Sequence, residues 1–225
     1  LTRTDPDAPK HRGITYFLVD MRTPGIEVRP LKQITGAAHF NEVFLTDVRI
    51  PHENIIGQVD AGWGPMMTTL SNERSLIGGS SRGDFREIAE LARRGGAADD
   101  AVLRQMLARS FTRLEILKYL GYRVRTAAAK GIAPGPESSI MKLLVSQHLS
   151  AQGDLFLAMQ GAAGMLAGDD ALDGGRWQME FLGQWSAKIG GGTDEIQRNT
   201  IGEKVLALPP EPRVDKNIPF RDIPK

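Results

Sequence analysis

The chain contains no cysteine in its 225 residues. This absence excludes disulfide bonds, thiolate metal sites, iron-sulfur ligation and cysteine nucleophiles together. The four histidines, His11, His39, His52 and His148, do not have the spacing of metal ligands. The sequence therefore predicts no metal site.

An excess of one charge is also missing. Lysine and arginine number 28 against 27 aspartate and glutamate residues, a formal net charge of +1. Such a balance gives no electrostatic reason to expect a nucleic acid or an anionic membrane as partner.

No apolar run approaches the roughly 18 residues that a membrane-spanning helix needs. The first residues are polar, without the apolar core of a signal peptide, which predicts a cytoplasmic protein. They also lack an initiator methionine, so we expect a fragment whose N-terminal part is absent.

The order of the predicted elements is strands first and long helices after them. β-prone apolar or alternating runs predict strands over residues 14–19, 26–29 and 42–48, too few for an independent β domain. Apolar residues at helical spacing predict helices over 62–93, from 99 or 100 to the turn at 131–136, from 137 or 138 to about 166, and over 177–185. The predicted fold class is mainly α, an antiparallel four-helix bundle preceded by a partial β domain. The predicted domains are 1–58 (β), 59–208 (bundle) and 209–225 (an extended tail).

Three successive glycines, Gly190–Gly192, precede a predicted helix that runs to about Leu206. Thr193 is a plausible N-cap, and Asp194 and Glu195 would lie in the first turn, where carboxylates suit the helix dipole. A triple glycine costs backbone entropy, which indicates positive φ angles or the close approach of a ligand. The alternative is a flexible connector that ends in an ordinary N-cap.

The residues after the glycines carry a resemblance. Gly192-Thr193-Asp194-Glu195-Ile196-Gln197-Arg198 resembles the Gly-Thr-x-x-Ile-Gln-Arg signature near the C-terminus of acyl-CoA dehydrogenases. Residues 42–51 resemble that family's strand ending in Asp-Val-x-Val-Pro. The chain is thus similar to the end of the family's middle β domain and its C-terminal helical domain. The resemblance implies an FAD cofactor, with Gly191, Gly192, Thr193 and Glu195 near the flavin.

The same resemblance implies a reaction and partners. Family members oxidise an acyl-CoA thioester to a trans-2-enoyl-CoA and pass the electrons to an electron-transfer flavoprotein. They assemble as dimers of dimers, so a tetramer of like or unlike subunits is expected.

Many members carry their catalytic glutamate just before the Gly-Thr pair, where this chain has Gly190 and Gly191. In one branch of the family the base lies on the first bundle helix, in a Leu-x-x-Glu-Arg context. Residues 70–74 match that pattern, which makes Glu73 the candidate base and Arg74 a candidate substrate-binding residue. The alternatives are a solvated glutamate beside an arginine and an arginine that pairs with neighbouring acids.

Two further family motifs contact the FAD of a neighbouring subunit. For Gln-x-x-Gly-Gly, which touches the adenosine half, the chain keeps Gln160 and Gly164 but has alanine at the first glycine. The alternative for Gln160 is a surface amide near a helix end. The second motif, Arg-x-x-Phe-Gly, whose arginine pairs with the FAD pyrophosphate in the family, is missing, with Arg93 or Arg94 as candidate substitutes. These departures favour a second hypothesis, a non-catalytic or FAD-site-completing subunit of a heteromeric complex. A third, a bundle that only binds a partner, leaves the Gly-Thr-x-x-Ile-Gln-Arg match unexplained.

Overall fold

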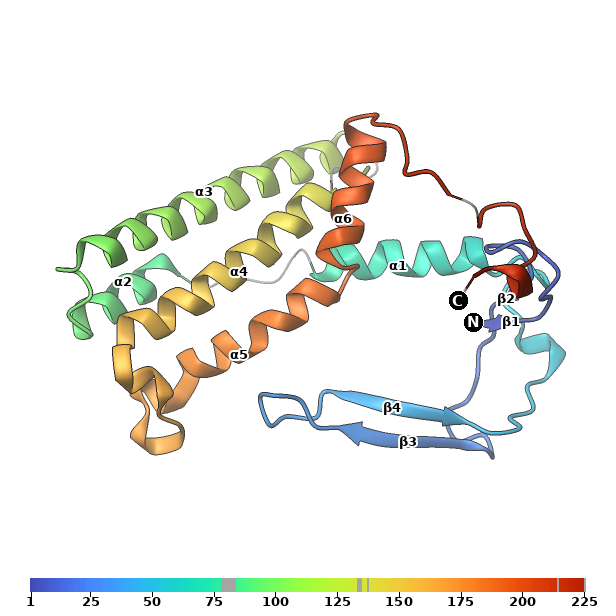
Figure 1. The fold of residues 1–225 in the computed structure, drawn as a ribbon, viewed down its shortest axis with the longest axis horizontal. Helices are drawn as coiled ribbons and strands as arrows, with labels where there is room; N and C mark the ends of the chain where they lie inside the picture. The colour runs from blue at the N-terminus through green and yellow to red at the C-terminus, as the bar shows by residue number, and fades with distance from the viewer. Residues whose placement is uncertain (78–83, 133–134, 137, 214, 225) are drawn as a thin grey trace. The chain divides into compact units, whose positions relative to one another are not determined.

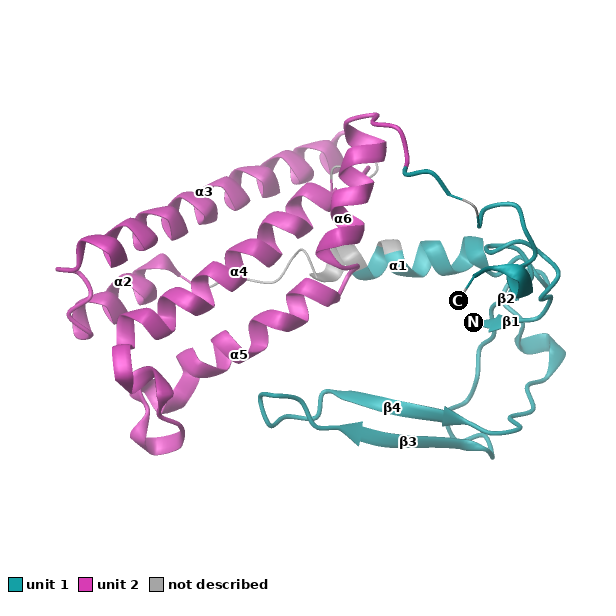
Figure 2. Ribbon diagram, viewed as in Figure 1, with its two compact units in different colours: residues 1–75, 211–225 teal, residues 76–210 magenta. Residues whose placement is uncertain are grey.

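The structure is a computed structural model that describes residues 1–225 except 78–83, 133–134, 137, 214 and 225, and except the side chains of 71 and 74–77. The chain forms two compact units, drawn in two colours in Figure 2. Unit 1 comprises Leu1–Ser75 and Glu211–Lys225, and unit 2 comprises Leu76–Pro210. Among the described helices, none is long and apolar enough to cross a membrane.

Unit 1 contains two small antiparallel sheets. β1 (Thr2–Arg3) pairs with β2 (Ile14–Thr15), and β3 (Ile26–Leu31) pairs with β4 (Phe40–Leu45). Every residue of β4 is exposed, and so is every residue of β3 after Ile26. The hairpin therefore has little buried surface of its own, and an isolated pair of strands is only marginally stable in water.

The tail, residues 211–225, lies against the start of the chain within unit 1. The Phe220 N–H donates to the Ala8 carbonyl over 3.0 Å, and Lys10 pairs with Asp215 at 2.9 Å. The short 3-10 helix η6 (Phe220–Asp222) lies in this region. After the 3-10 turn η1 (His52–Asn54), α1 (Trp63–Ile77) begins with Trp63, whose ring stacks on His11 at 3.9 Å. These contacts join the first residues of the chain to its C-terminal tail and to the start of α1.

Unit 2 is a helical bundle around α4 (Figure 1). Its helices are α2 (Phe85–Arg94), α3 (Ala101–Ala129), α4 (Ser138–Gln160), α5 (Arg176–Ile189) and α6 (Asp194–Thr200). Short segments η2 (Gly161–Met165), η3 (Gly168–Asp170) and η4 (Leu172–Gly175) join α4 to α5, and the π-helical η5 (Ile201–Val205) extends α6. α4 contacts α2, α3, α5 and α6, so it is the central helix.

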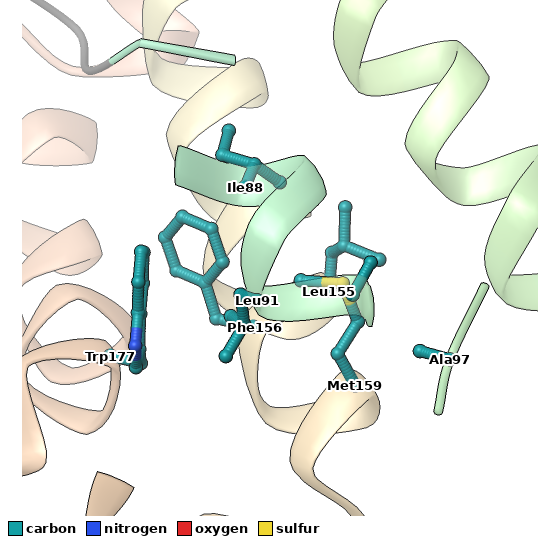
Figure 3. Close-up of a cluster of buried hydrophobic side chains, with 8 residues drawn as sticks. Ile88, Leu91, Ala97, Leu155, Phe156, Met159 and Trp177 are labelled. Atoms are coloured by element: carbon teal, nitrogen blue, oxygen red, sulfur yellow. The ribbon is translucent and has the colours of Figure 1, made fainter. Parts of the chain in front are cut away.

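The core of unit 2 lies where α2, α4 and the start of α5 meet (Figure 3). Leu91 of α2 and Leu155 of α4 are almost completely buried. The Phe156 and Trp177 rings pack at 4.7 Å between centroids. Burying aromatic and aliphatic side chains of this size contributes on the order of 1.5–3 kcal/mol each. The remaining members of this cluster are Ile88, Ala92, Ala97 and Met159.

The fold class predicted from the sequence, a helical bundle preceded by small β elements, is confirmed, and several element limits are corrected. The single helix predicted over 62–93 is wrong, because Asp84 has an extended backbone and caps a new helix by accepting from the Arg86 N–H. The helix predicted to run to about 166 ends at Gln160, since Gly161 adopts a φ of 55° and a 3-10 segment follows. The strand predicted over 14–19 shortens to Ile14–Thr15. The predicted domain limits of 1–58, 59–208 and 209–225 stay predictions.

Candidate functional site

The glycine loop between α5 and α6 is a fixed structure held by one glutamine. Gly191 and Gly192 have φ angles of 67° and 91°, which disfavour any residue with a Cβ. The buried Gln197 side chain turns back from α6, and its Nε2 donates to the carbonyls of Gly191 at 2.9 Å and Gly192 at 3.3 Å. A Cβ at Gly192 would lie 2.7 Å from that nitrogen. Both glycines are therefore required by the loop's own geometry.

Thr193 begins α6 as predicted. Its Oγ1 accepts a hydrogen bond from the Ile196 N–H over 3.3 Å, the pattern of an N-cap side chain. The N–H groups of Gly191 and Gly192 donate to no acceptor in the described part of the chain. The loop therefore offers free donors on a backbone without side chains.

Asp194 anchors the loop to the bundle. Its carboxylate lies 3.2 Å from Lys142 Nζ of α4 and 3.7 Å from Lys188 Nζ of α5. Only 7% of the Asp194 side chain and 11% of the Lys142 side chain are exposed. Burial acts to raise the pKa of Asp194, but hydrogen bonds from neighbouring side chains, Lys142 among them, and the charges of both lysines outweigh it, so the pKa lies below its usual value. A buried, ionised pair thus fixes the start of α6 against α4.

The other face of α6 is open. The Glu195 side chain is 76% exposed and lies 3.6 Å from Arg198, and Ile196 is also exposed. Glu195 and Ile196 therefore project away from the buried Asp194 and Gln197.

A second cluster lies at the opposite end of α4, around Gln160. Gln160 Nε2 donates to the Phe156 carbonyl at 3.0 Å, and its Oε1 accepts from Gln178 Nε2 at 3.2 Å. Gly164 is buried, and a Cβ there would lie 3.2 Å from the Leu157 carbonyl oxygen. Gln160 is half-buried and held by two other residues, so it is not a free surface amide.

Arg94, one candidate substitute for the missing arginine motif, already has a partner. Its guanidinium donates two hydrogen bonds to the Asp173 carboxylate, at 2.9 and 2.7 Å, and Trp177 Nε1 donates to the same carboxylate at 2.7 Å. The bonds from Arg94 and then from Trp177 lower the pKa of Asp173 to about 2. Arg93 lies 3.1 Å from Glu90 on the surface. A pyrophosphate would have to displace Asp173 to gain both donors of Arg94.

Glu73 belongs to α1 and to unit 1, whereas the glycine loop belongs to unit 2. Its side chain is exposed, and so are those of Leu70 and Asn72 on the same helix. The backbone of Arg74 is part of α1, but its side chain lies outside the described residues. The roles of both residues stay predictions.

Within unit 2 the predicted cofactor residues form two groups. Gly191, Gly192 and Thr193 lie together, anchored to Lys142 near the start of α4, and Gln160 and Gly164 lie at its end. Lys142 and Gln160 are 18 positions apart, which is about 27 Å along a helix at ~1.5 Å per residue. The two groups therefore lie apart on this unit, and their role in cofactor binding stays a prediction. Among the described residues, no group of three histidine or acidic side chains is placed to hold a metal ion.

Sequence reasoning misses the side chains that fix these sites. It identifies Gln197 only as part of a signature and Asp194 only as an acid at a helix start. The one local signal for Gln197 is its place a few residues after glycines that need support. No local signal exists for Lys142, which pairs with Asp194 across 52 positions of the sequence.

Comparison with known proteins gives consistent matches. Residues 60–206 match the family model described as "Acyl-CoA dehydrogenase, C-terminal domain". The chain is 39% identical over 211 residues to the acyl-CoA dehydrogenase FadE34 of Mycobacterium tuberculosis, covering 93% of this chain and 28% of that protein. It is 36% identical over 218 residues to the acyl-CoA dehydrogenase IpdE1 of the same species, covering 94% of this chain and 55% of that protein.

Solved structures also match. The chain superposes on the Tcur3481-Tcur3483 steroid ACAD with a TM-score of 0.80 and 26% identity, covering 93% of this chain and 56% of that one. It also resembles the ChsE4-ChsE5 complex from Mycobacterium tuberculosis, with a TM-score of 0.70 and 25% identity over 90% of this chain and 54% of that one. The chain thus spans between about a quarter and a little over half of the proteins it matches.

Proposed function

The chain belongs to the acyl-CoA dehydrogenase family, and we therefore propose that it acts in the FAD-dependent oxidation of an acyl-CoA thioester to a trans-2-enoyl-CoA. The electrons would pass on to an electron-transfer flavoprotein. Because the chain spans only part of its relatives, the proposal concerns the protein in which this chain works.

The observation that carries the proposal is the glycine loop. A cofactor with a flat, polar edge needs a surface that lets it approach closely and offers hydrogen-bond donors. Gly191 and Gly192 present no side chain, and their N–H groups have no acceptor within the described chain. Their carbonyl groups already accept hydrogen bonds from Gln197 Nε2. These residues fit the polar edge of a flavin. FAD, when bound, supplies the acceptor for the hydride that leaves Cβ of the substrate.

We assign the proton-transfer step to Glu73. Its carboxylate would take the α proton of the thioester, which is weakly acidic and requires a base held close in a site that excludes water. The Glu73 side chain is exposed on α1, so a bound substrate would have to cover it to exclude water. Arg74, the next residue, would bind the CoA thioester.

Gln160 and Gly164 would contact the adenosine half of an FAD held mainly by another subunit. Their separation from the glycine loop by most of the length of α4 supports two different cofactors, one at each end of the unit. This arrangement requires at least a dimer, and a dimer of dimers fits the family.

A second function is favoured by a specific observation, the commitment of Arg94 to Asp173. If neither Arg93 nor Arg94 is free for the pyrophosphate, the chain would complete a partner's site without holding FAD tightly itself. Two similar structures are named for paired components, Tcur3481-Tcur3483 and ChsE4-ChsE5. Under this alternative the protein would be a subunit of a heteromeric dehydrogenase.

The test is flavin reduction in the whole protein, purified with and without any partner subunit. Acyl-CoA thioesters of short, long, branched and steroid acyl groups are added without oxygen, and bleaching of the long-wavelength flavin band is followed. Glu73→Gln should slow bleaching by about 10²-fold or more, the usual contribution of a general base, without loss of bound flavin. Glu180→Gln, at an exposed glutamate of α5, is the matched control and should bleach like the wild type.

Normal bleaching in Glu73→Gln would remove Glu73 from the mechanism. A protein that gains flavin only on mixing with a second subunit would favour the heteromeric alternative.

A further inference from the structure

A polar cavity lies between α3 and α4, within unit 2 and away from both groups of predicted cofactor residues. Its volume is about 150 Å³, enough for several water molecules. α3 contributes side chains at helical spacing, which places them on one face, and α4 does the same from the facing side. The lining residues are Met106, Arg109, Ser110, Arg113, His148, Ala151 and Gln152.

The charge of this cavity is entirely positive. Arg109 and Arg113 lie four residues apart on α3, and neither forms an ion pair with a carboxylate of the described residues. None of the lining side chains is acidic. Like charges at this helical spacing repel each other. By contrast, three arginines of the bundle outside the cavity, Arg93, Arg94 and Arg176, each pair with an acid.

The cavity also contains an unused hydrogen-bonding group. Ser110 is 5% exposed, and its Oγ has no hydrogen-bond partner in the described part of the chain. A buried hydroxyl without a partner is unfavourable, so native structures satisfy such groups with a neighbour, a water or a ligand. His148 and Gln152, both buried, add polar atoms to the opposite wall.

We propose that this cavity binds one small tetrahedral oxyanion, of the phosphate or sulfate class. Two guanidinium groups match the charge of a dianion and donate in the geometry that phosphate oxygens accept. The Ser110 hydroxyl supplies a further donor, and the cavity has room for an ion of this size. The bound anion would neutralise the two arginines and link α3 to α4.

The experiment is calorimetric titration of inorganic phosphate, and then sulfate, into the whole chain at constant ionic strength, with chloride as the balancing anion. We expect one site per chain. Arg109→Gln and Arg113→Gln should each weaken phosphate binding about tenfold or more, because each removes a charged donor. Ser110→Ala should weaken it by a smaller factor. Arg123→Gln, at an exposed arginine on the same helix outside the cavity, should bind as the wild type does.

Circular dichroism and the unfolding temperature without phosphate show whether each variant is folded. If an arginine variant fails to fold, the Ser110→Ala titration decides the question. No binding by the wild type, or equal binding by every folded variant, would overturn the proposal. Sedimentation is measured in parallel. If phosphate only dissociates an oligomer, and the dissociated chain binds no phosphate, the proposal is wrong.

Discussion

Replacing Gly192 by alanine tests the geometry of the glycine loop. Gly192 has a φ of 91°, and an added Cβ would lie 2.7 Å from Gln197 Nε2, a contact that real structures do not show. The unfavourable φ costs an L-residue about 1–2 kcal/mol. Pushing the buried Gln197 amide off the two carbonyls costs about 1–3 kcal/mol more, because polar groups lose their partners. Gly192→Ala should therefore destabilise unit 2 by about 2–5 kcal/mol.

The assay is urea unfolding followed by far-ultraviolet circular dichroism, which reports the helices of unit 2. Gly183→Ala is the matched control. Gly183 lies inside α5, and a Cβ added there would meet no other atom within 4 Å, so alanine fits. It should stabilise the helix by about 0.5–1 kcal/mol, because alanine loses less backbone entropy than glycine on folding. The two glycine substitutions should thus change the free energy of unfolding in opposite directions.

The Gln197→Ala background separates the two contributions. Without the glutamine side chain the clash disappears, so the cost of Gly192→Ala should fall to the ~1–2 kcal/mol of the φ angle. A cost below about 1 kcal/mol in the wild type, or an equal cost in both backgrounds, would refute the role assigned to Gln197.

Two other predictions concern buried and surface acids. Asp194→Asn leaves the nearly buried Lys142 without its anion and should lower the free energy of unfolding in urea by about 3 kcal/mol. Glu195→Gln, the control, should change it by less than about 0.5 kcal/mol. Similar values for both variants would contradict the anchoring role of Asp194. The pKa of Asp173 is about 2, below the ordinary 3.8, because Arg94 donates hydrogen bonds to its carboxylate. The ionised carboxylate therefore contributes stability that is present above pH 3.8 and lost as the pH falls toward 2. Thermal unfolding at stepped pH should show a shallower decline over this window in Asp173→Asn, and parallel curves for variant and wild type would count against the pair.

Features set by neighbouring residues were predictable from the sequence. Thr193 caps α6 as predicted, and α3 follows Asp100, one of the two starting points that the sequence left open. The long helices follow from apolar residues at helical spacing. In each case the stabilising partner lies within a few residues, so the sequence around it contains the information.

Features set by distant partners were not predictable. Asp194 meets Lys142, and Arg94 meets Asp173, over 52 and 79 positions of the sequence. The pairing of Arg94 depends on Asp173, which has a φ of 52° in the connection between α4 and α5. No pattern of spacing reveals which of several surface acids reaches a given arginine. Resemblance identified the loop, but only the structure shows why its glutamine is there.

The most direct test of the proposed function is the reaction itself. The whole protein is mixed with an acyl-CoA thioester without oxygen, the flavin spectrum is recorded, and the product is analysed by mass spectrometry. We predict a bleached flavin and a product that has lost two hydrogen atoms, one from Cα and one from Cβ. A flavin-loaded protein that leaves every thioester of the panel unchanged would contradict the proposed function.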